Sequence, residues 1–133
     1  MKFFLIILLL FVAVDALIIG YVIYRRTRRR LPDKVIQKVR TAWKELIHQN
    51  DHRHAIMDAD KLLDYALGEM GHRGNLGNKL KKAPKLFSDL NGLWQAHKVR
   101  NNIAHQIAYK VDEKTYKKSM LSFKRAFQDL KFF

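Results

Sequence analysis

The chain lacks cysteine altogether and has few acidic residues for its length. Without cysteine, disulfide bonds, thiolate zinc sites and cysteine nucleophiles are excluded. No segment shows the alternation of apolar and polar residues that is typical of a half-buried β-strand. We therefore expect an all-α protein.

The shortage of acidic residues leaves a strongly basic chain. Only 12 Asp and Glu stand against 26 Lys and Arg, which gives a net charge of +14. Residues 31–133 alone carry 20 basic and 11 acidic residues, a net charge of +9, so the excess is not confined to one cluster. Such a charge suits an anionic partner, either nucleic acid or the inner leaflet of a membrane. A solubilising surface rich in lysine would have the same composition.

The longest apolar run covers residues 3–24, in which 16 of the 22 residues are Leu, Ile, Val or Phe. As a helix, this run would be about 33 Å long, enough to cross a hydrocarbon core of about 30 Å. These 16 side chains favour insertion by about 5–10 kcal/mol in total, whereas Asp15 opposes it by about 2.5–3.5 kcal/mol. We therefore predict a transmembrane anchor over residues 1–30 of a single-pass membrane protein.

The arginines after this run set the predicted orientation, because basic flanks stay in the cytoplasm. Arginine occupies five of the six positions from 25 to 30, whereas only Lys2 and the amino group precede the run. We predict that the N-terminus lies outside and that the C-terminal domain, residues 31–133, is cytoplasmic. A cleaved signal peptide is the alternative, with a small-residue cleavage site at residues 14–16. The apolar residues that continue past this site, and the arginines, favour the anchor.

Residues 31–133 are predicted to form one small bundle of four to five helices. Asp51 and Asp112 precede helical patterns as N-caps, and Gly71 is a natural C-terminal stop. Trp43 and Trp94 lie in apolar stripes and are expected in the core. The four main predicted helices span residues 33–49, 52–70, 92–108 and 113–131, and short helical segments are expected around residues 76–82 and 85–90.

Residues 99–105 carry side chains that can act on a phosphodiester. In a helix, Asn101 and His105 lie on one face, and His97 extends that stripe by another turn. Arg100 lies about 100° around the helix, but its long side chain can reach the same surface. Imidazole transfers protons near neutral pH, and guanidinium holds a phosphate or its transition-state charge. Together these groups could cleave RNA without a metal ion, with histidine acting on the 2′-hydroxyl or on the leaving oxygen.

The segment Arg100-Asn101-x-x-x-His105 resembles the motif of HEPN domains, which are helical nucleotide-binding and ribonuclease modules. That motif has an arginine, a polar residue and a histidine, with four to six residues between arginine and histidine; here there are four. The amphipathic segment 55–67 is similar to an early helix of the family. The resemblance implies a homodimer whose two motifs line one cleft. In active members it also implies a metal-independent endoribonuclease without a cofactor. Arg100 and His105 would then be catalytic, and Asn101 would orient them.

Lysines around this segment are expected to contact phosphates, and a metal site is not expected. His48 and His52 are four residues apart, but Asn50-Asp51 breaks the helix between them, and no Glu lies at a suitable offset. The glycine-rich segment 71–79 lacks the phosphate-loop pattern. The lysines expected to contact phosphates are Lys79, Lys81, Lys82 and Lys98.

Other interpretations of the same residues stay open. Asn101 and His105 could form hydrogen bonds within a packed bundle, with Arg100 paired to Asp60 or Asp64. The site could also bind RNA without cleaving it. A noncatalytic membrane adaptor that binds a protein partner or anionic lipid is the alternative function, because each basic residue near an acidic membrane surface adds about 1 kcal/mol of attraction.

Overall fold

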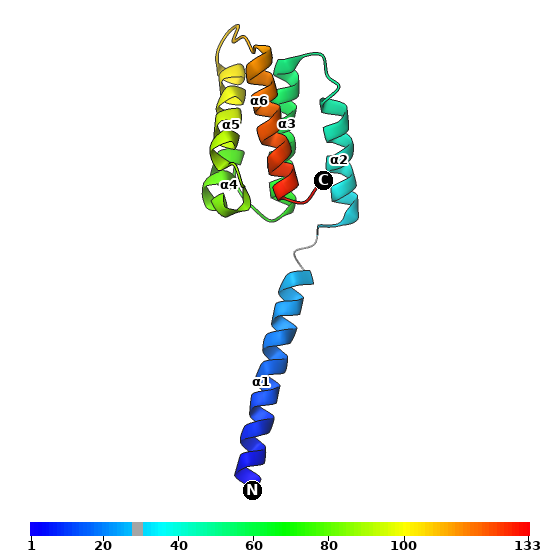
Figure 1. Ribbon diagram of the computed structural model, residues 1–133, viewed down its shortest axis with the longest axis vertical. Helices are drawn as coiled ribbons and strands as arrows, with labels where there is room; N and C mark the ends of the chain where they lie inside the picture. Colours follow the sequence, from blue (N-terminus) through cyan, green and yellow to red (C-terminus); the bar gives the residue numbers. More distant parts are fainter. Residues whose placement is uncertain (28–30) are drawn as a thin grey trace. The chain divides into compact units, whose positions relative to one another are not determined.

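The computed structural model of the protein describes residues 1–27 and 31–133, which form two compact units (Figure 1). The first unit contains one helix, α1 (Lys2–Thr27), and the second unit, Pro32–Phe133, contains all the others. No strand occurs in the described residues, and every regular element there is helical, as predicted. The last three arginines of the predicted cytoplasmic flank, residues 28–30, lie outside the described residues.

Helix α1 is long and apolar enough to cross a membrane. Its stretch from Lys2 to Val22 has a mean hydropathy of 3.0. A signal sequence near the N-terminus has the same length and composition. The helix therefore fits both the predicted anchor and its alternative.

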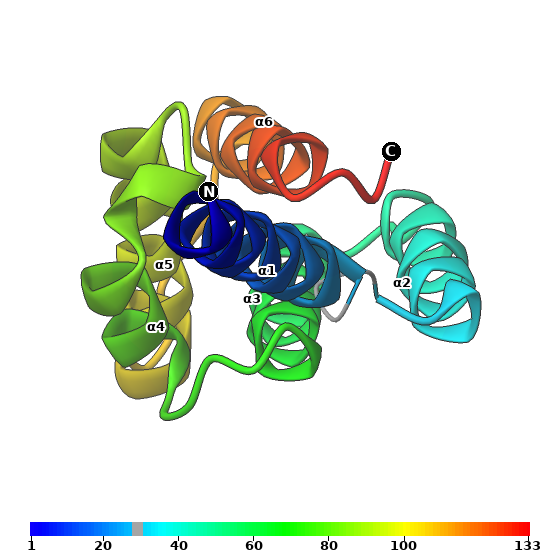
Figure 2. The ribbon, with the colours of Figure 1, turned by 90° about the horizontal axis from the view of Figure 1, so that it is seen from below.

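The second unit is a bundle built around α3, which packs against α2, α4, α5 and α6 (Figures 1 and 2). Five side chains of α3 that follow a helical repeat are completely buried, as their spacing predicted: Ile56, Ala59, Leu63, Ala66 and Leu67. The helices of this unit are α2 (Asp33–Leu46), α3 (His52–Glu69), α4 (Leu76–Lys82), α5 (Leu90–His105) and α6 (Glu113–Asp129), with a short 3₁₀ turn η1 (Pro84–Leu86) before α5.

Aromatic side chains pack between α2, α6 and the last residues of the chain. Trp43 of α2 is buried, and its ring lies 5.3 Å from that of Phe127 and 5.7 Å from that of Phe133. Phe132 is completely buried, and its carbonyl oxygen accepts a hydrogen bond from Nε of Arg40. The prediction that Trp43 is a core residue is therefore confirmed.

Two aspartates start α3 and α6, as predicted. Asp51 accepts hydrogen bonds from the backbone N–H groups of Arg53 and His54, at 2.8 and 3.2 Å. The bond from the His54 backbone, together with one from the His54 ring, lowers the pKa of the Asp51 carboxyl. Asp112 accepts a hydrogen bond from the backbone N–H of Thr115 at 2.7 Å, and hydrogen bonds from the Thr115 side chain and backbone lower the pKa of the Asp112 carboxyl. Both carboxylates therefore stay ionised to a lower pH than an aspartate without these hydrogen bonds, which keeps these helix starts in place.

Several predicted helix boundaries were wrong. Residues 85–90 do not form a helix, because Asp89 is the N-cap of α5 and accepts a hydrogen bond from the Gly92 N–H at 2.8 Å. A Cβ at position 92 would overlap the Asp89 carboxylate, so the cap depends on this glycine. Helix α5 ends at His105 instead of residue 108, since Gln106 is extended and Ala108 has φ 57°. Helix α2 ends at Leu46 instead of residue 49.

Helices α3 and α6 end with the same backbone motif but with different residues. Gly71 and Lys131 each have a positive φ, 90° and 63°. After each, a backbone N–H bonds back over one turn: His72 to the Leu67 carbonyl and Phe132 to the Phe127 carbonyl, both at 3.0 Å. This is the Schellman arrangement, in which glycine carries no steric penalty and other residues are strained.

We expect Lys131→Gly to raise the free energy of unfolding of the bundle by about 1 kcal/mol, and Gly71→Ala to lower it by about the same amount. A Cβ at position 71 meets no atom within 4 Å, so that loss reports backbone strain alone. Urea titration of the full-length protein in detergent, followed by far-ultraviolet circular dichroism, measures both changes. Lys131→Ala keeps the strained backbone and is the matched control. If Lys131→Ala stabilises the protein as much as Lys131→Gly does, side-chain loss rather than backbone strain is the cause.

Candidate active site

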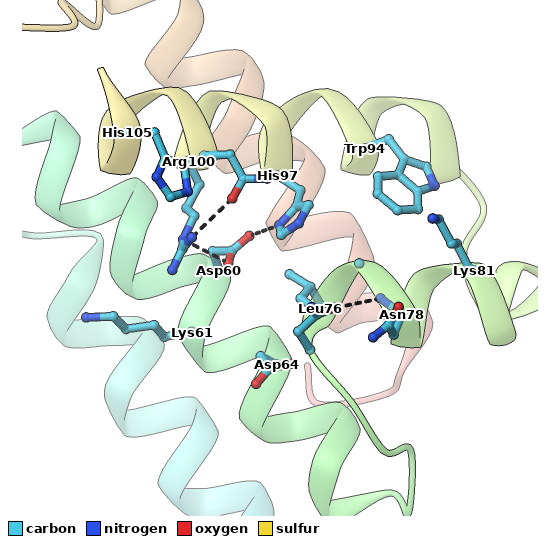
Figure 3. Close-up of a pocket in the computed structure, with 13 residues that line it drawn as sticks. Asp60, Lys61, Asp64, Leu76, Asn78, Lys81, Trp94, His97, Arg100 and His105 are labelled. Carbon is cyan, nitrogen blue, oxygen red and sulfur yellow. Dashed lines mark hydrogen bonds and ion pairs between the residues drawn. The ribbon is translucent and has the colours of Figure 1, made fainter. Parts of the chain in front are cut away.

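A pocket of about 550 Å³ lies between α3, α5 and the beginning of α4 (Figure 3). Its α5 wall carries the residues singled out from the sequence, and its α3 wall carries acidic and basic side chains. Gathered in this one pocket are His97, Arg100, Asn101 and His105 from α5 and Asp60, Lys61 and Asp64 from α3. The four residues of α5 that were singled out from the sequence therefore line one pocket, together with side chains of α3.

Asp60 is the buried centre of the α3 wall, with 5% of its side chain exposed. Its Oδ1 lies 2.7 Å from Nδ1 of His97, and its Oδ2 lies 3.4 Å from Nε of Arg100 (Figure 3). Of the two acids that the sequence offered as partners of Arg100, Asp60 is the one in contact. A buried carboxylate needs such partners, because an unpaired charge loses its hydration without compensation.

The Arg100 guanidinium is held on two sides but keeps access to the pocket. Its Nη1 donates a hydrogen bond to Oδ1 of the neighbouring Asn101 at 3.1 Å, while its Nε faces Asp60. The Nε atom is buried, and its contact with Asp60 is an ion pair without hydrogen-bond geometry. The side chain is 27% exposed. Because a guanidinium has five N–H donors, these contacts leave others for an anion in the pocket.

His105 is the last residue of α5, and it lines the pocket with an exposed side chain. It is not enclosed by apolar residues, so water or a substrate can reach its ring. The interpretation in which Arg100 is paired to Asp60 is correct for the arginine. His105, by contrast, is open to solvent, so a role in the packed core of the bundle does not apply to it.

The four lysines expected to contact phosphate occupy different surroundings. Lys81 lines the pocket, and Lys98 lines a shallow groove beside it together with Trp94 and Asn101. Lys82 is exposed but lies outside the pocket lining. Lys79 was placed wrongly: it is 5% exposed, and its Nζ lies 2.8 Å from both the backbone carbonyl and Oδ1 of Asp64. Its ammonium group is therefore used to join α4 to α3.

The charges around the pocket favour an anion. Lys61, Lys81 and Arg100 carry three positive charges in the lining, and Asp60 and Asp64 carry two negative charges. The buried ammonium group of Lys79 balances Asp64 from behind the wall. The three positive charges of the lining then outnumber the one carboxylate left, that of Asp60. A histidine of the lining adds one more positive charge when it is protonated.

Trp94 is not a core residue, contrary to the prediction. Its side chain is partly exposed and lines both the pocket and the neighbouring groove. Its ring meets that of His97 edge-on, with centroids 5.9 Å apart. Gly77 lies opposite, where a Cβ would be 3.6 Å from Nε2 of His97 and 3.7 Å from the Trp94 ring. An indole at the edge of a basic pocket can stack on a nucleobase.

Three polar lining residues were missed by the sequence analysis: Lys61, Asn75 and Asn78. Asn75 caps α4 by accepting a hydrogen bond from the backbone N–H of Asn78 at 2.9 Å. These residues come from other elements than α5, and no spacing within one helix could relate them to Arg100. The N-cap position of Asn75, just before a short lysine-rich helix, was the one local signal for its place.

The remaining histidines form no metal centre in the part of the chain that the structure describes. No group of three His, Cys, Asp or Glu side chains there is arranged so that it could hold a metal ion. The His52 ring stacks on Tyr116 at 4.0 Å between centroids, and His54 bonds to Asp51. These two imidazoles therefore make structural contacts at the start of α3.

Comparison of the chain with protein-family models, with curated proteins and with solved structures finds no match.

We expect Asp60→Asn to lower the free energy of unfolding by about 2 kcal/mol, because Arg100 then loses its buried countercharge. Asp58→Asn is the matched control on the same helix. Its side chain is 43% exposed and lies 3.9 Å from Lys61, so its ion pair contributes under about 0.5 kcal/mol. Asp58 also accepts a hydrogen bond from Nε2 of Gln49 at 3.0 Å, which the amide oxygen of asparagine can accept in its place. Thermal and urea unfolding of the full-length protein compare the two variants. Equal effects would show that Asp60 does not hold the pocket together.

Proposed function

We propose that this protein is a membrane-anchored endoribonuclease that cleaves single-stranded RNA without a metal ion. The observation that carries the proposal is the convergence of Arg100, Asn101 and exposed His105 in one basic pocket. The same three residues form the segment that resembles HEPN domains, whose active members have this activity.

RNA suits the pocket because the lining offers a separate group for each part of a nucleotide. Arg100, with Lys61 and Lys81, can hold the phosphate by charge-assisted hydrogen bonds. The partly exposed indole of Trp94, at the edge of the pocket, can stack on a base. We expect single-stranded RNA, because its unstacked bases can stack on the Trp94 ring. The bases of a duplex are already stacked and paired and cannot reach that ring.

The chemistry of cleavage follows from an arginine beside an imidazole. Attack of the ribose 2′-oxygen on phosphorus builds negative charge on the nonbridging oxygens, and a fixed guanidinium stabilises that charge more than it stabilises the starting phosphate. His105 can transfer a proton to or from the reacting oxygens. Asn101, through its bond to Nη1 of Arg100, holds the guanidinium in position. Arg100 and His105 are thus the proposed catalytic residues, and Asn101 is a positioning residue.

The proposed location is the cytoplasmic side of a membrane, where α1 would anchor the basic bundle. Support comes from the length and hydropathy of α1 and from the five arginines that follow its apolar part. We also propose a homodimer, as the resemblance implies. In a dimer, the pockets of two copies would share one cleft.

Purified full-length protein in detergent should cleave single-stranded RNA in the presence of EDTA. His105→Ala should reduce the rate by about 10²-fold or more, because proton transfer is lost. His48→Ala is the control, since His48 is an exposed residue outside the pocket. Gel analysis of an end-labelled oligonucleotide measures the rates. Equal cleavage by wild-type and His105→Ala protein would mean that another site or a contaminant cuts the RNA.

Two further outcomes separate the alternative functions. If no cleavage occurs but RNA binding depends on salt and is weakened in Arg100→Ala, the pocket binds RNA without cutting it. If the protein binds anionic vesicles and has no affinity for RNA, the adaptor function replaces the proposal.

We expect the full-length protein to stay with membranes after extraction with alkaline carbonate. The insertion free energy of the apolar run exceeds the cost of Asp15, and alkaline carbonate does not release integral proteins. Intact-mass measurement of membrane-purified protein checks the anchor directly, because an uncleaved chain retains residues 1–16. A mature protein that begins at Leu17 would contradict the anchor and indicate a cleaved signal sequence.

A further inference from the structure

His97 and Asp60 form a buried acid–imidazole pair inside the pocket whose role the proposed activity leaves open. The two side chains are 14% and 5% exposed, and Nδ1 of His97 lies 2.7 Å from Oδ1 of Asp60. An ionised carboxylate only accepts hydrogen bonds, so Nδ1 must carry the proton in this contact. In neutral His97, the lone pair is therefore on Nε2.

The Nε2 atom of His97 lies on the pocket side of the ring, close to Gly77. A Cβ at position 77 would be only 3.6 Å from this atom, so the glycine leaves the space beside it unoccupied by a side chain. His97 lines both the pocket and the neighbouring groove. A substrate hydroxyl in the pocket can therefore approach the atom that carries the lone pair.

The second imidazole of the pocket, His105, has different surroundings. In the described part of the chain, the histidines paired with a carboxylate are His52, His54 and His97. His105 is exposed and lies two turns from His97, about 12 Å along the axis of α5. In Figure 3, the Arg100 side chain lies between the two rings. A phosphate held by Arg100 would have one imidazole on each side.

We propose that the Asp60–His97 pair is the general base of RNA cleavage and that His105 is the general acid, so that one copy of the chain holds both proton-transfer groups. This inference rests on the proposed ribonuclease function. Asp60 acts as a positioning residue, because it orients His97 and balances the charge that His97 gains.

The proposed reaction balances without any other reactant. Nε2 of His97 takes the proton of the ribose 2′-hydroxyl as the 2′-oxygen forms a bond to phosphorus. The bond from phosphorus to the 5′-oxygen breaks, and the His105 imidazolium gives its proton to that oxygen. The products are a 2′,3′-cyclic phosphate and a 5′-hydroxyl end. Exchange with water removes the proton from His97 and restores the one on His105.

The two roles can be separated with a pair of oligonucleotides that contain one ribose at the cleavage position. One carries the normal 5′-oxygen at the scissile phosphate, and the other carries a bridging 5′-sulfur, which leaves as a thiolate without protonation. A third strand, with 2′-deoxyribose at the same position, should not be cut. Full-length protein in detergent with EDTA is used throughout.

His97→Gln is the informative variant, because its amide can still donate a hydrogen bond to Asp60 but cannot take a proton. We expect it to slow cleavage of both ribose substrates by about 10²-fold or more. His105→Ala should slow the oxygen substrate by a similar factor and cut the sulfur substrate at close to the wild-type rate. His48→Ala should match wild type on both. Circular dichroism and urea titration check that each variant is folded.

Three outcomes would overturn the assignment. If His97→Gln cuts the oxygen substrate as fast as wild type, the pair is only structural. If the sulfur substrate rescues His97→Gln, His97 is the acid instead of the base. With wild-type protein alone, the rate on the sulfur substrate should rise with pH to a plateau, because only a base must be deprotonated. A rate that falls with pH contradicts the proposal even if His97→Gln does not fold.

Failure of the underlying function looks different from failure of this inference. Wild-type protein that cuts neither ribose substrate would remove the ribonuclease function and the assigned roles together. Wild-type protein that cuts both, alongside an active His97→Gln variant, would remove only the role of the Asp60–His97 pair.

Discussion

The carboxylate of Asp60 organises the pocket, because a negative charge so far from water must be paired. Asp60 lies on α3, at the centre of the bundle, and both of its partners lie on α5. Arg100 and His97 are one turn apart on that helix, so a single buried charge fixes two side chains of the candidate site at once. The contact also fixes how α5 is rotated against α3. The positions of Asn101 and His105 follow from that rotation.

A second buried charge shapes the opposite wall. The ammonium of Lys79 is almost fully enclosed and bonds to both the carboxylate and the backbone carbonyl of Asp64. This joins the short helix α4 to α3, although α4 has few apolar residues of its own to bury. Asn78 and Lys81 are carried to the edge of the pocket as a result. Two charge contacts therefore hold α5 and α4 against α3 around the pocket: those of Asp60 with α5, and that of Asp64 with Lys79.

The sequence predicted most of the helices and half of the site. Where apolar residues repeat regularly, as from Ile56 to Leu67, burial dominates and the helix is read directly from the spacing. The predicted end of α5 at residue 108 was too late, and Ile107, an apolar residue beyond the true end of the helix, is fully exposed. Residues 99–105 could be grouped because they share one helix. Lys61 and Asn78 could not, because their place depends on how three helices pack.

Lys79 and Trp94 show why residue type alone misleads. Because Lys79 is followed by other lysines, it suggested a solvent-exposed phosphate contact, but the carboxylate of Asp64 on the preceding helix made its burial favourable. An indole in an apolar stripe suggested the core, but Trp94 lies on the side of α5 that faces the pocket. Both outcomes depend on the partner across the interface, which no local pattern contains.

The division of the two tryptophans has a practical result for spectroscopy. Trp43 is packed among phenylalanines in the core, whereas Trp94 lies at the edge of the pocket. The chain contains no other tryptophan. Intrinsic emission therefore combines a blue-shifted component that reports folding with a red-shifted one that reports occupancy of the pocket. A quencher that stacks on Trp94 would dim the second component and leave the first intact, so ligand capture and unfolding can be followed separately in one unlabelled sample.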